Sequence, residues 1–148
     1  YLTEVEPGLG YGEALLAPTL LYSPVTEALA RAGIVPHYAA NITGHGWRKL
    51  LRHPSRFTYR IHNVPAVPPV LKFIQAQARQ DDRESYSTFN MGAGFALFVG
   101  AADAQRCVGV ARAKGIDAWV AGRVEAGPKQ LLIEPLALRF GDEALNLR

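Results

Sequence analysis

Residues 89–94 read Phe-Asn-Met-Gly-Ala-Gly and run directly into the apolar segment Phe95–Val99. That segment has the length and composition of a buried strand, so the glycines mark the turn that enters it. The amide of Asn90 offers both a donor and an acceptor to a ligand. Asparagine also tolerates turn conformations and bonds to neighbouring backbone, so Asn90 and Gly92 can serve either a ligand or the turn.

A second glycine-containing stretch, Asn41-Ile42-Thr43-Gly44-His45-Gly46, joins a predicted strand to a predicted short helix. Glycines let the backbone approach a ligand closely, and the free amides at a helix start favour a phosphate group. Thr43 adds a hydroxyl donor, and Arg48, Lys49 and Arg52 follow within the next turns. Two glycines before a helix also form plain turns, so a phosphate site and an ordinary turn are both open interpretations.

The other candidate groups favour neither a metal site nor a familiar nucleotide motif. The four histidines, His37, His45, His53 and His62, show no two-histidine helical spacing and no acidic cluster beside them. The acidic run at residues 81–84 is interpreted as a solvated loop, with a magnesium site as the alternative. Cys107 is expected to be an inert core residue. The P-loop and dinucleotide fingerprints are both absent.

Hydrophobic periodicity predicts alternating helices and strands. A helix is expected over residues 24–33, with Ser23 as its cap, Pro24 in its first turn and Gly33 at its end. After residue 46, a short helix is expected with Trp47, Leu50 and Leu51 facing inward. Later helices are predicted after Pro65–Pro69 (stripe Val67, Val70, Leu71, Ile74 and Ala78), over 80–87 as a turn or short helix, and around 104–111, ended by Gly115. Strands are predicted at 34–42, Phe57–Ile61, Phe95–Val99, Trp119–Val124 and Leu131–Ile133, with a turn at Glu125–Lys129.

This order of elements predicts an α+β fold with α/β-like alternation, in which helices lie mainly on one face of a mixed sheet. The 148 residues suit one domain. We expect an extended lead-in at 1–13, a core at about 14–134 and a tail at 135–148.

Composition narrows the classes of function. Apolar residues make up 49% and charged residues 20%, which is typical of a folded globular chain rather than a disordered one. No apolar run reaches the roughly 18 residues that a membrane helix needs. The net charge of +3, without a basic tail, argues against a nucleic-acid partner. The single cysteine and the lack of a signal-peptide pattern at the start favour a cytoplasmic location.

Four stretches, in this order, resemble the aminoimidazole-ribonucleotide synthetase family, also called phosphoribosylformylglycinamidine cyclo-ligase. Leu15–Tyr22 resembles the family's entry to its carboxy-terminal domain, and Asn41–Gly46 resembles its "HITGGG" loop. Glu84–Gly94 resembles its "E-x-Y-x-TFNMG-x-G" segment, which is the most specific of the four, and Ala118–Val124 resembles a family strand. The resemblance covers roughly residues 12–134.

The resemblance implies an ATP- and Mg²⁺-dependent enzyme of purine biosynthesis that phosphorylates an amide or similar oxygen, after which a nucleophile displaces the phosphate. Phosphorylation makes that oxygen a good leaving group, and positioning and charge neutralisation carry most of the catalysis. In the family an amino-terminal domain supplies most ATP and metal contacts and much of a homodimer interface. No part of this chain resembles that domain, which would act in cis or in trans.

The chain departs from the family at several positions expected to face the substrate. Asn41 replaces the loop histidine, and His45 replaces the middle glycine. Lys49–His53 replaces an "ENxPR" pattern, and Ser87 stands where an arginine is expected. The "TG-x-G" form also resembles the selenophosphate synthetase branch. A selenophosphate-synthetase-like paralogue and a non-catalytic ligand-binding or regulatory module that keeps the fold are therefore alternatives.

The resemblance and the residues together assign a candidate substrate-phosphate site. His45 is the candidate catalytic residue, because it could donate a hydrogen bond to a developing anion. The candidate binding residues are Asn41, Thr43, Gly44, His45, Gly46, Arg48, Arg52, Asn90 and Gly92.

Overall fold

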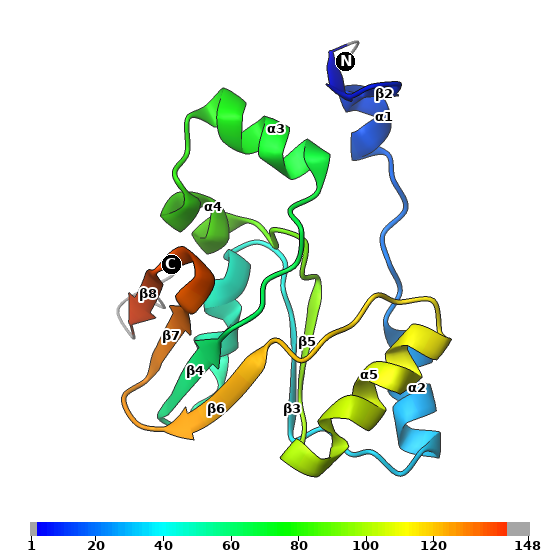
Figure 1. Ribbon diagram of the computed structural model, residues 1–148, viewed down its shortest axis with the longest axis vertical. Helices are drawn as coiled ribbons and strands as arrows, with labels where there is room; N and C mark the ends of the chain where they lie inside the picture. The colour runs from blue at the N-terminus through cyan, green and yellow to red at the C-terminus, as the bar shows by residue number, and fades with distance from the viewer. Residues whose placement is uncertain (1–2, 142–148) are drawn as a thin grey trace.

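A four-stranded mixed sheet forms the larger half of the protein, whose computed structural model describes residues 3–141 (Figure 1). The strand order is β6-β4-β7-β8. β4 pairs antiparallel with β6 and parallel with β7, and β7 pairs antiparallel with β8. The strands are β4 (Phe57–Ile61), β6 (Gly122–Ala126), β7 (Gln130–Ile133) and β8 (Leu138–Gly141).

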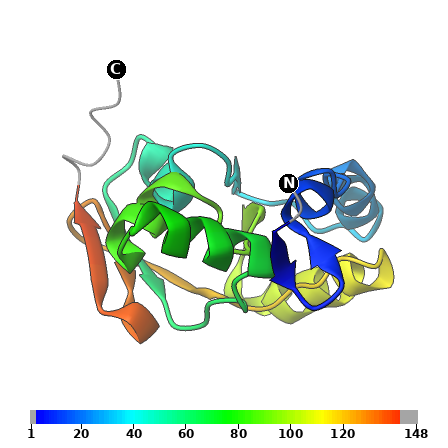
Figure 2. The same ribbon diagram turned by 90° about the horizontal axis from the view of Figure 1, so that it is seen from above.

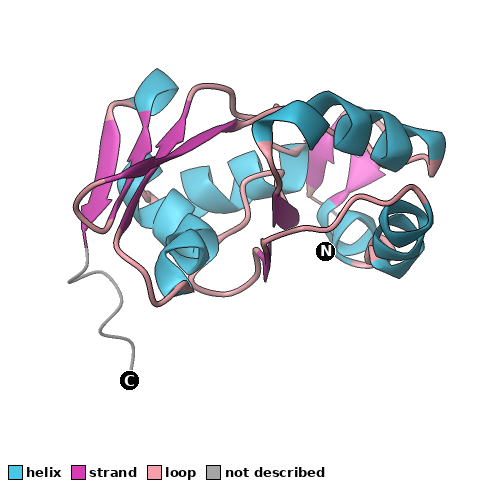
Figure 3. Ribbon diagram, turned by 90° about the horizontal axis from the view of Figure 1, so that it is seen from below, coloured by secondary structure: helices cyan, strands magenta, loops and turns pink. Residues whose placement is uncertain are grey.

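One face of this sheet is apolar and forms the main core. Tyr59, Leu131 and Phe140 lie in one row across three strands, and each is at most 2% exposed. The 3₁₀-helix η1 (Gly46–Arg52) and helix α4 (Asp82–Thr88) contribute Trp47 and Tyr86 to the same core. The helices lie mainly to one side of the sheet (Figure 3), as predicted.

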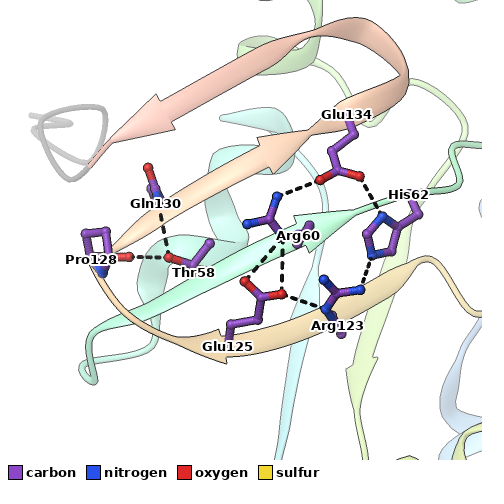
Figure 4. A network of polar contacts seen from close by, with 8 residues as sticks. All are labelled: Thr58, Arg60, His62, Arg123, Glu125, Pro128, Gln130 and Glu134. Atoms are coloured by element: carbon purple, nitrogen blue, oxygen red, sulfur yellow. Dashed lines mark hydrogen bonds and ion pairs between the residues drawn. The ribbon is translucent and has the colours of Figure 1, made fainter.

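The opposite face of the sheet carries a network of charged side chains, because successive residues of a strand point to opposite faces (Figure 4). The Arg60 guanidinium bonds to Glu125 at 3.2 Å and to Glu134 at 2.6 Å. His62 Nδ1 lies 2.7 Å from Glu134, and Arg123 lies 3.1 Å from His62 Nε2. Arginine can only donate, so Nε2 accepts and the His62 Nδ1–H donates to Glu134.

A two-stranded sheet and a helix pair build the second half. β3 (Tyr38–Asn41) pairs antiparallel with β5 (Phe95–Phe98). Helices α2 (Ser23–Arg31) and α5 (Ala104–Ala113) pack around a separate small core. That core consists of Val25, Leu29, Ile34, Cys107 and Ala111. Burial raises the pKa of the Cys107 thiol, which fits the prediction of an unreactive core cysteine.

Helix α3 (Pro69–Ala78) lies in front in the view from above (Figure 2). The hairpin of β1 (Glu4–Glu6) and β2 (Leu9–Gly10) lies at one end of it. The predicted stripe of α3 is only half-buried, Ala78 is exposed and Val67 precedes the helix. The short 3₁₀-helices η2 (Ala101–Asp103) and η3 (Glu134–Leu136) complete the described elements.

Three predicted boundaries are wrong. The expected irregular lead-in at 1–13 contains β1, β2 and the start of α1 (Tyr11–Leu15), because Tyr11 packs on the distant Phe73 with ring centroids 5.1 Å apart. The expected tail contains β8, whose Phe140 is buried, while residues 142–148 lie outside the described part. The strand predicted at Trp119–Val124 begins only at residue 122 and continues through part of the expected turn, because pairing with β4 sets its register.

Helix ends follow the predicted chemistry only in part. Ser23 is the first residue of α2 rather than its cap, which is Tyr22. Gly33 ends this helix as expected, with φ of +70° and the Ile34 amide donating to the Leu29 carbonyl at 2.9 Å. Asp81 of the acidic run caps α4, accepting from the Glu84 amide at 2.7 Å.

Candidate phosphate-binding loop

Pairing of β3 with β5 brings the two glycine-containing stretches together. Asn41 at the end of β3 lies opposite Phe95 at the start of β5. One residue further, the Ile42 amide donates to the Gly94 carbonyl at 2.8 Å. The 43–46 loop and the 90–94 turn therefore lie at the same end of this small sheet, although about fifty residues separate them in the chain.

The 43–46 loop is a tight turn with an open side. The Gly46 amide donates to the Thr43 carbonyl at 2.9 Å, and His45 adopts a left-handed conformation with φ of +81°. Thr43 and Gly44 are exposed, and a Cβ placed on Gly44 would meet no atom within 4 Å. A ligand can therefore approach the backbone from the Gly44 side.

Gly46 has a packing role that the sequence interpretation missed. Its φ is +54°, and a Cβ there would lie 2.2 Å from the Tyr86 carbonyl oxygen and 2.9 Å from that of Phe89. The close approach of η1 to the last turn of α4 therefore accounts for this glycine without any ligand.

Two cationic side chains form hydrogen bonds with polar side-chain atoms of the loop. The Lys49 ammonium donates to the Thr43 hydroxyl, and an Arg52 Nη2 lies 3.4 Å from His45 Nδ1. Desolvation, followed by the nearby Arg52 charge, lowers the pKa of Lys49. Within residues 3–141, neither Lys49 nor Arg52 pairs with a carboxylate. Among the described residues, the loop therefore gathers positive charge without a paired carboxylate.

Arg48 and Trp47 link the loop to the neighbouring turn. Arg48 Nε donates to the Ser87 carbonyl at 3.0 Å, at the end of α4. Trp47 Nε1 donates to the Asn90 carbonyl at 2.8 Å. Arg48 was predicted to contribute charge to a phosphate, and the structure places at least part of its guanidinium on backbone instead.

Asn90 organises its own turn. Its side-chain oxygen accepts from the Gly92 amide at 3.0 Å, and its carbonyl accepts from the Ala93 amide at 3.0 Å. Gly92 has φ of +97°, and a Cβ there would lie 2.7 Å from the Ala66 carbonyl. The turn interpretation thus explains Gly92 and the side-chain oxygen of Asn90. The Asn90 Nδ2 group has no hydrogen-bond partner within the described residues and is free to donate.

Sequence reasoning missed two contributors. Lys49 was noted among the cations that follow the loop but was left out of the candidate binding residues, and its place three residues after Gly46 is the one local signal for its contact with the loop. Tyr22 crosses the second turn: a Cβ on Gly94 would lie 2.1 Å from its hydroxyl oxygen, and its ring stacks on Phe95 with centroids 4.9 Å apart. Burial raises the pKa of Tyr22. No local pattern predicts this long-range contact.

The donors at the loop suit an anion rather than a metal ion. Within the described part of the chain, no three His, Cys, Asp or Glu side chains form a group that could hold a metal. The acidic run, predicted as a solvated loop, instead forms the cap and first turn of α4, since Asp81 caps the helix and Asp82 accepts from Gln75 at 2.8 Å. No described helix is long and apolar enough to span a bilayer.

Comparison with known proteins agrees with this architecture. Residues 8–133 match the family model described as "AIR synthase related protein, C-terminal domain". Among the relatives named phosphoribosylformylglycinamidine cyclo-ligase, that of Methanocaldococcus jannaschii is 39% identical over 126 residues, which is 82% of this chain and 36% of the relative. Those of Methanococcus vannielii (36% identical over 126 residues; 82% of this chain, 36% of the relative) and Caldicellulosiruptor bescii (32% over 133; 87% and 38%) are also similar.

This chain spans little more than a third of the length of these relatives. The match to the family model nevertheless extends from β2 to the end of β7, and includes both the 43–46 loop and the 90–94 turn. The chain therefore belongs to the AIR synthase related family and contains its C-terminal domain.

Proposed function

We propose that this chain is the C-terminal domain of an ATP-dependent, AIR synthetase-like enzyme of the purine-biosynthesis type, and that its 43–46 loop holds a phosphate group of the substrate. The observation that carries the proposal is the convergence of the open Gly44 backbone with Thr43, Lys49 and Arg52, where no carboxylate of residues 3–141 pairs with Lys49 or Arg52. Such a site attracts a dianionic phosphate, since charge-assisted donors bind it more strongly than neutral ones.

In this proposal, His45 acts on the substrate group that phosphorylation activates. If its Nδ1 accepts from Arg52, the proton of a neutral imidazole lies on Nε2. Nε2–H can then donate to an oxygen that gains negative charge as a nucleophile attacks. The free Asn90 Nδ2 on the adjoining turn offers a second neutral donor that would orient the substrate.

ATP and Mg²⁺ belong mainly to a different part of the enzyme. The loop has cationic and neutral donors, which match phosphate oxygens, but it lacks the carboxylates that Mg²⁺ prefers. The groups that supply phosphorylation would therefore come from an amino-terminal domain, in cis or in trans, in what we expect to be a homodimeric enzyme of the cytoplasm. This chain's part is to bind and orient the phosphorylated substrate.

The alternative of a non-catalytic binding or regulatory module is favoured by one specific observation. Asn41 and His45 occupy positions where the family pattern has histidine and glycine, and Asn41 is exposed beside the loop. A module that only binds would keep the phosphate-loop affinity and lack turnover in the presence of an amino-terminal domain. A synthetase-like paralogue would show both.

Calorimetric titration of the chain with ribose 5-phosphate-bearing nucleotide precursors tests the proposal, with ATP–Mg²⁺ titrated separately. We expect Gly44→Val to weaken precursor binding by at least about tenfold, because a branched side chain would fill the approach to the loop. Gly100→Val is the matched control, since a Cβ at Gly100 also meets no atom within 4 Å and lies outside the loop. Unchanged affinity in folded Gly44→Val would contradict the proposal.

A further inference from the structure

A pocket lies at the opposite end of β3 from the 43–46 loop, in the seam between the two sheets. It has a volume of about 250 Å³. Tyr38 and Phe98, which are cross-strand partners, form one wall, and Phe57 and Tyr59 of β4 form another. His53 and Val124 close two further sides. Tyr38 starts the strand that Asn41 ends, so roughly 10 Å of strand separates the pocket from the loop.

The walls of this pocket are aromatic rings in mutual contact. Tyr38 packs edge-on against His53 with centroids 5.0 Å apart, and Tyr59 packs edge-on against Phe98 at 5.6 Å. Phe57 lies 5.5 Å from His53. Because these rings already pack against one another, they present a preformed apolar slot whose flat walls match a planar group.

One hydroxyl at this slot has no protein partner among the described residues. The Tyr59 side chain is only 2% exposed, yet its hydroxyl has no hydrogen-bond partner within residues 3–141. In that part of the chain no fully buried side-chain nitrogen or oxygen lacks a partner, so the Tyr59 hydroxyl must reach solvent. Tyr59 is one of the residues that line this pocket, which offers its hydroxyl a route to solvent. A buried hydroxyl without a protein partner is costly unless water or a ligand bonds to it.

The remaining polar groups of the pocket are also donors. His53 Nδ1 accepts from the Ser55 amide at 3.2 Å, so the proton of a neutral His53 lies on Nε2. The Tyr38 hydroxyl is a further donor. Of the residues that the structure describes, no carboxylate lines the pocket, and two imidazoles, His37 and His53, do. A pocket with hydrogen-bond donors and no carboxylate disfavours an organic cation, although aromatic rings alone would bind one.

We propose that this pocket binds a single planar heteroaromatic ring system of nucleobase size, whose edge carries hydrogen-bond acceptors. The flat aromatic walls select a ring, the volume of about 250 Å³ admits one ring system, and His53 Nε2–H, which can only donate, together with the Tyr59 hydroxyl, which can also donate, favours acceptors on its edge. The site is separate from the phosphate-binding loop and does not depend on the function proposed for it.

The test is titration of the 148-residue chain with adenine, with indole as a ring of similar size that lacks acceptors, and with tetramethylammonium as a cation. We expect adenine to bind more tightly than indole, and tetramethylammonium not to bind. Tyr59→Phe removes only the hydroxyl and should weaken adenine binding roughly 3- to 10-fold, the effect of one hydrogen bond. Val124→Trp should abolish binding, because Val124 is 43% exposed and its enlarged side chain would fill the slot.

Val35→Trp is the control for Val124→Trp, because Val35 is 77% exposed and does not line the pocket. It should bind adenine like the unmodified chain, and Gly44→Val should do so as well. The proposal is overturned if no ring binds, if tetramethylammonium binds in preference, or if folded Val124→Trp keeps the adenine affinity. Thermal unfolding of each variant establishes that it is folded.

Discussion

At the scale of single residues, the sequence singled out the glycines and the asparagine of the two turns, but it did not show why each of them occupies its position. Gly46 looked like a ligand contact and proves to be required by the backbone of α4, while Gly44 has no packing reason at all. The local sequence shows only that a residue is unusual for its surroundings. Only the approach of elements distant in the chain, such as Tyr22 over Gly94, reveals whether packing or a ligand explains it.

The packing role of Gly46 predicts a large loss of stability on adding one methyl group. Gly46→Ala should lower the free energy of unfolding by roughly 2–4 kcal/mol, because the left-handed φ and the clash with the Tyr86 carbonyl act together. Gly109→Ala, in an open and exposed position of α5, should instead raise it by roughly 0.5–1 kcal/mol. Urea unfolding measures both, and equal stabilities of the two variants would contradict this role.

The lowered pKa of Lys49 predicts that the stability of the chain depends on pH. Its pKa is lowered in the folded state by desolvation and then by Arg52, so the unfolded chain holds the proton to higher pH. Between the two pKa values the unfolded state binds more protons, and stability therefore rises with pH. The stability of the unmodified chain relative to Lys49→Met should improve as pH rises from neutrality towards the ordinary lysine range. A constant difference across pH, measured by urea unfolding, would rule this out.

At the scale of elements, periodicity predicted α2, α5 and the central strand β4 well, because each buries a regular set of apolar side chains. β8 escaped prediction because Leu138-Arg139-Phe140 offers a single alternation, too short to distinguish from a coil. Its strand conformation comes from pairing with β7. The start of β6 was misplaced for the same reason, since register with β4 rather than local composition sets it.

The charged network on the open face of the sheet should make stability fall at acid pH. Hydrogen bonds from Arg60 and then His62 lower the pKa of Glu134. A carboxylate with a depressed folded pKa stabilises the fold above its unfolded pKa, and this stabilisation is lost as pH falls through the folded value. Glu134→Gln should therefore show a shallower loss of stability below the ordinary glutamate range than the unmodified chain. Parallel acid-unfolding curves would contradict it.

At the scale of the whole molecule, the fold class and the family followed from the sequence, and an exposed apolar surface did not. Leu16, Leu20 and Leu21 are 84%, 58% and 73% exposed, in a segment between α1 and α2. Three large exposed leucines so close together are typical of an interaction surface.

We predict that this leucine surface is covered by the amino-terminal domain of the assembled enzyme. Replacing the three leucines with serine should change the free energy of unfolding of the chain by less than about 0.5 kcal/mol each, because they pack little in the isolated domain. The same variant should bind an added amino-terminal domain more weakly in sedimentation experiments. Strong destabilisation without any effect on association would assign these leucines to the core instead.

The central claim, that the 43–46 loop holds a phosphate, is tested most directly by following backbone and asparagine amide signals by NMR while a ribose 5-phosphate-bearing precursor is added. The account predicts saturable shifts concentrated at Thr43, Gly44 and His45, together with the free side-chain amide of Asn90, and the loss of these shifts in Gly44→Val. Shifts centred on Arg123 and Arg139 of the open sheet face, with the loop signals unchanged, would contradict it.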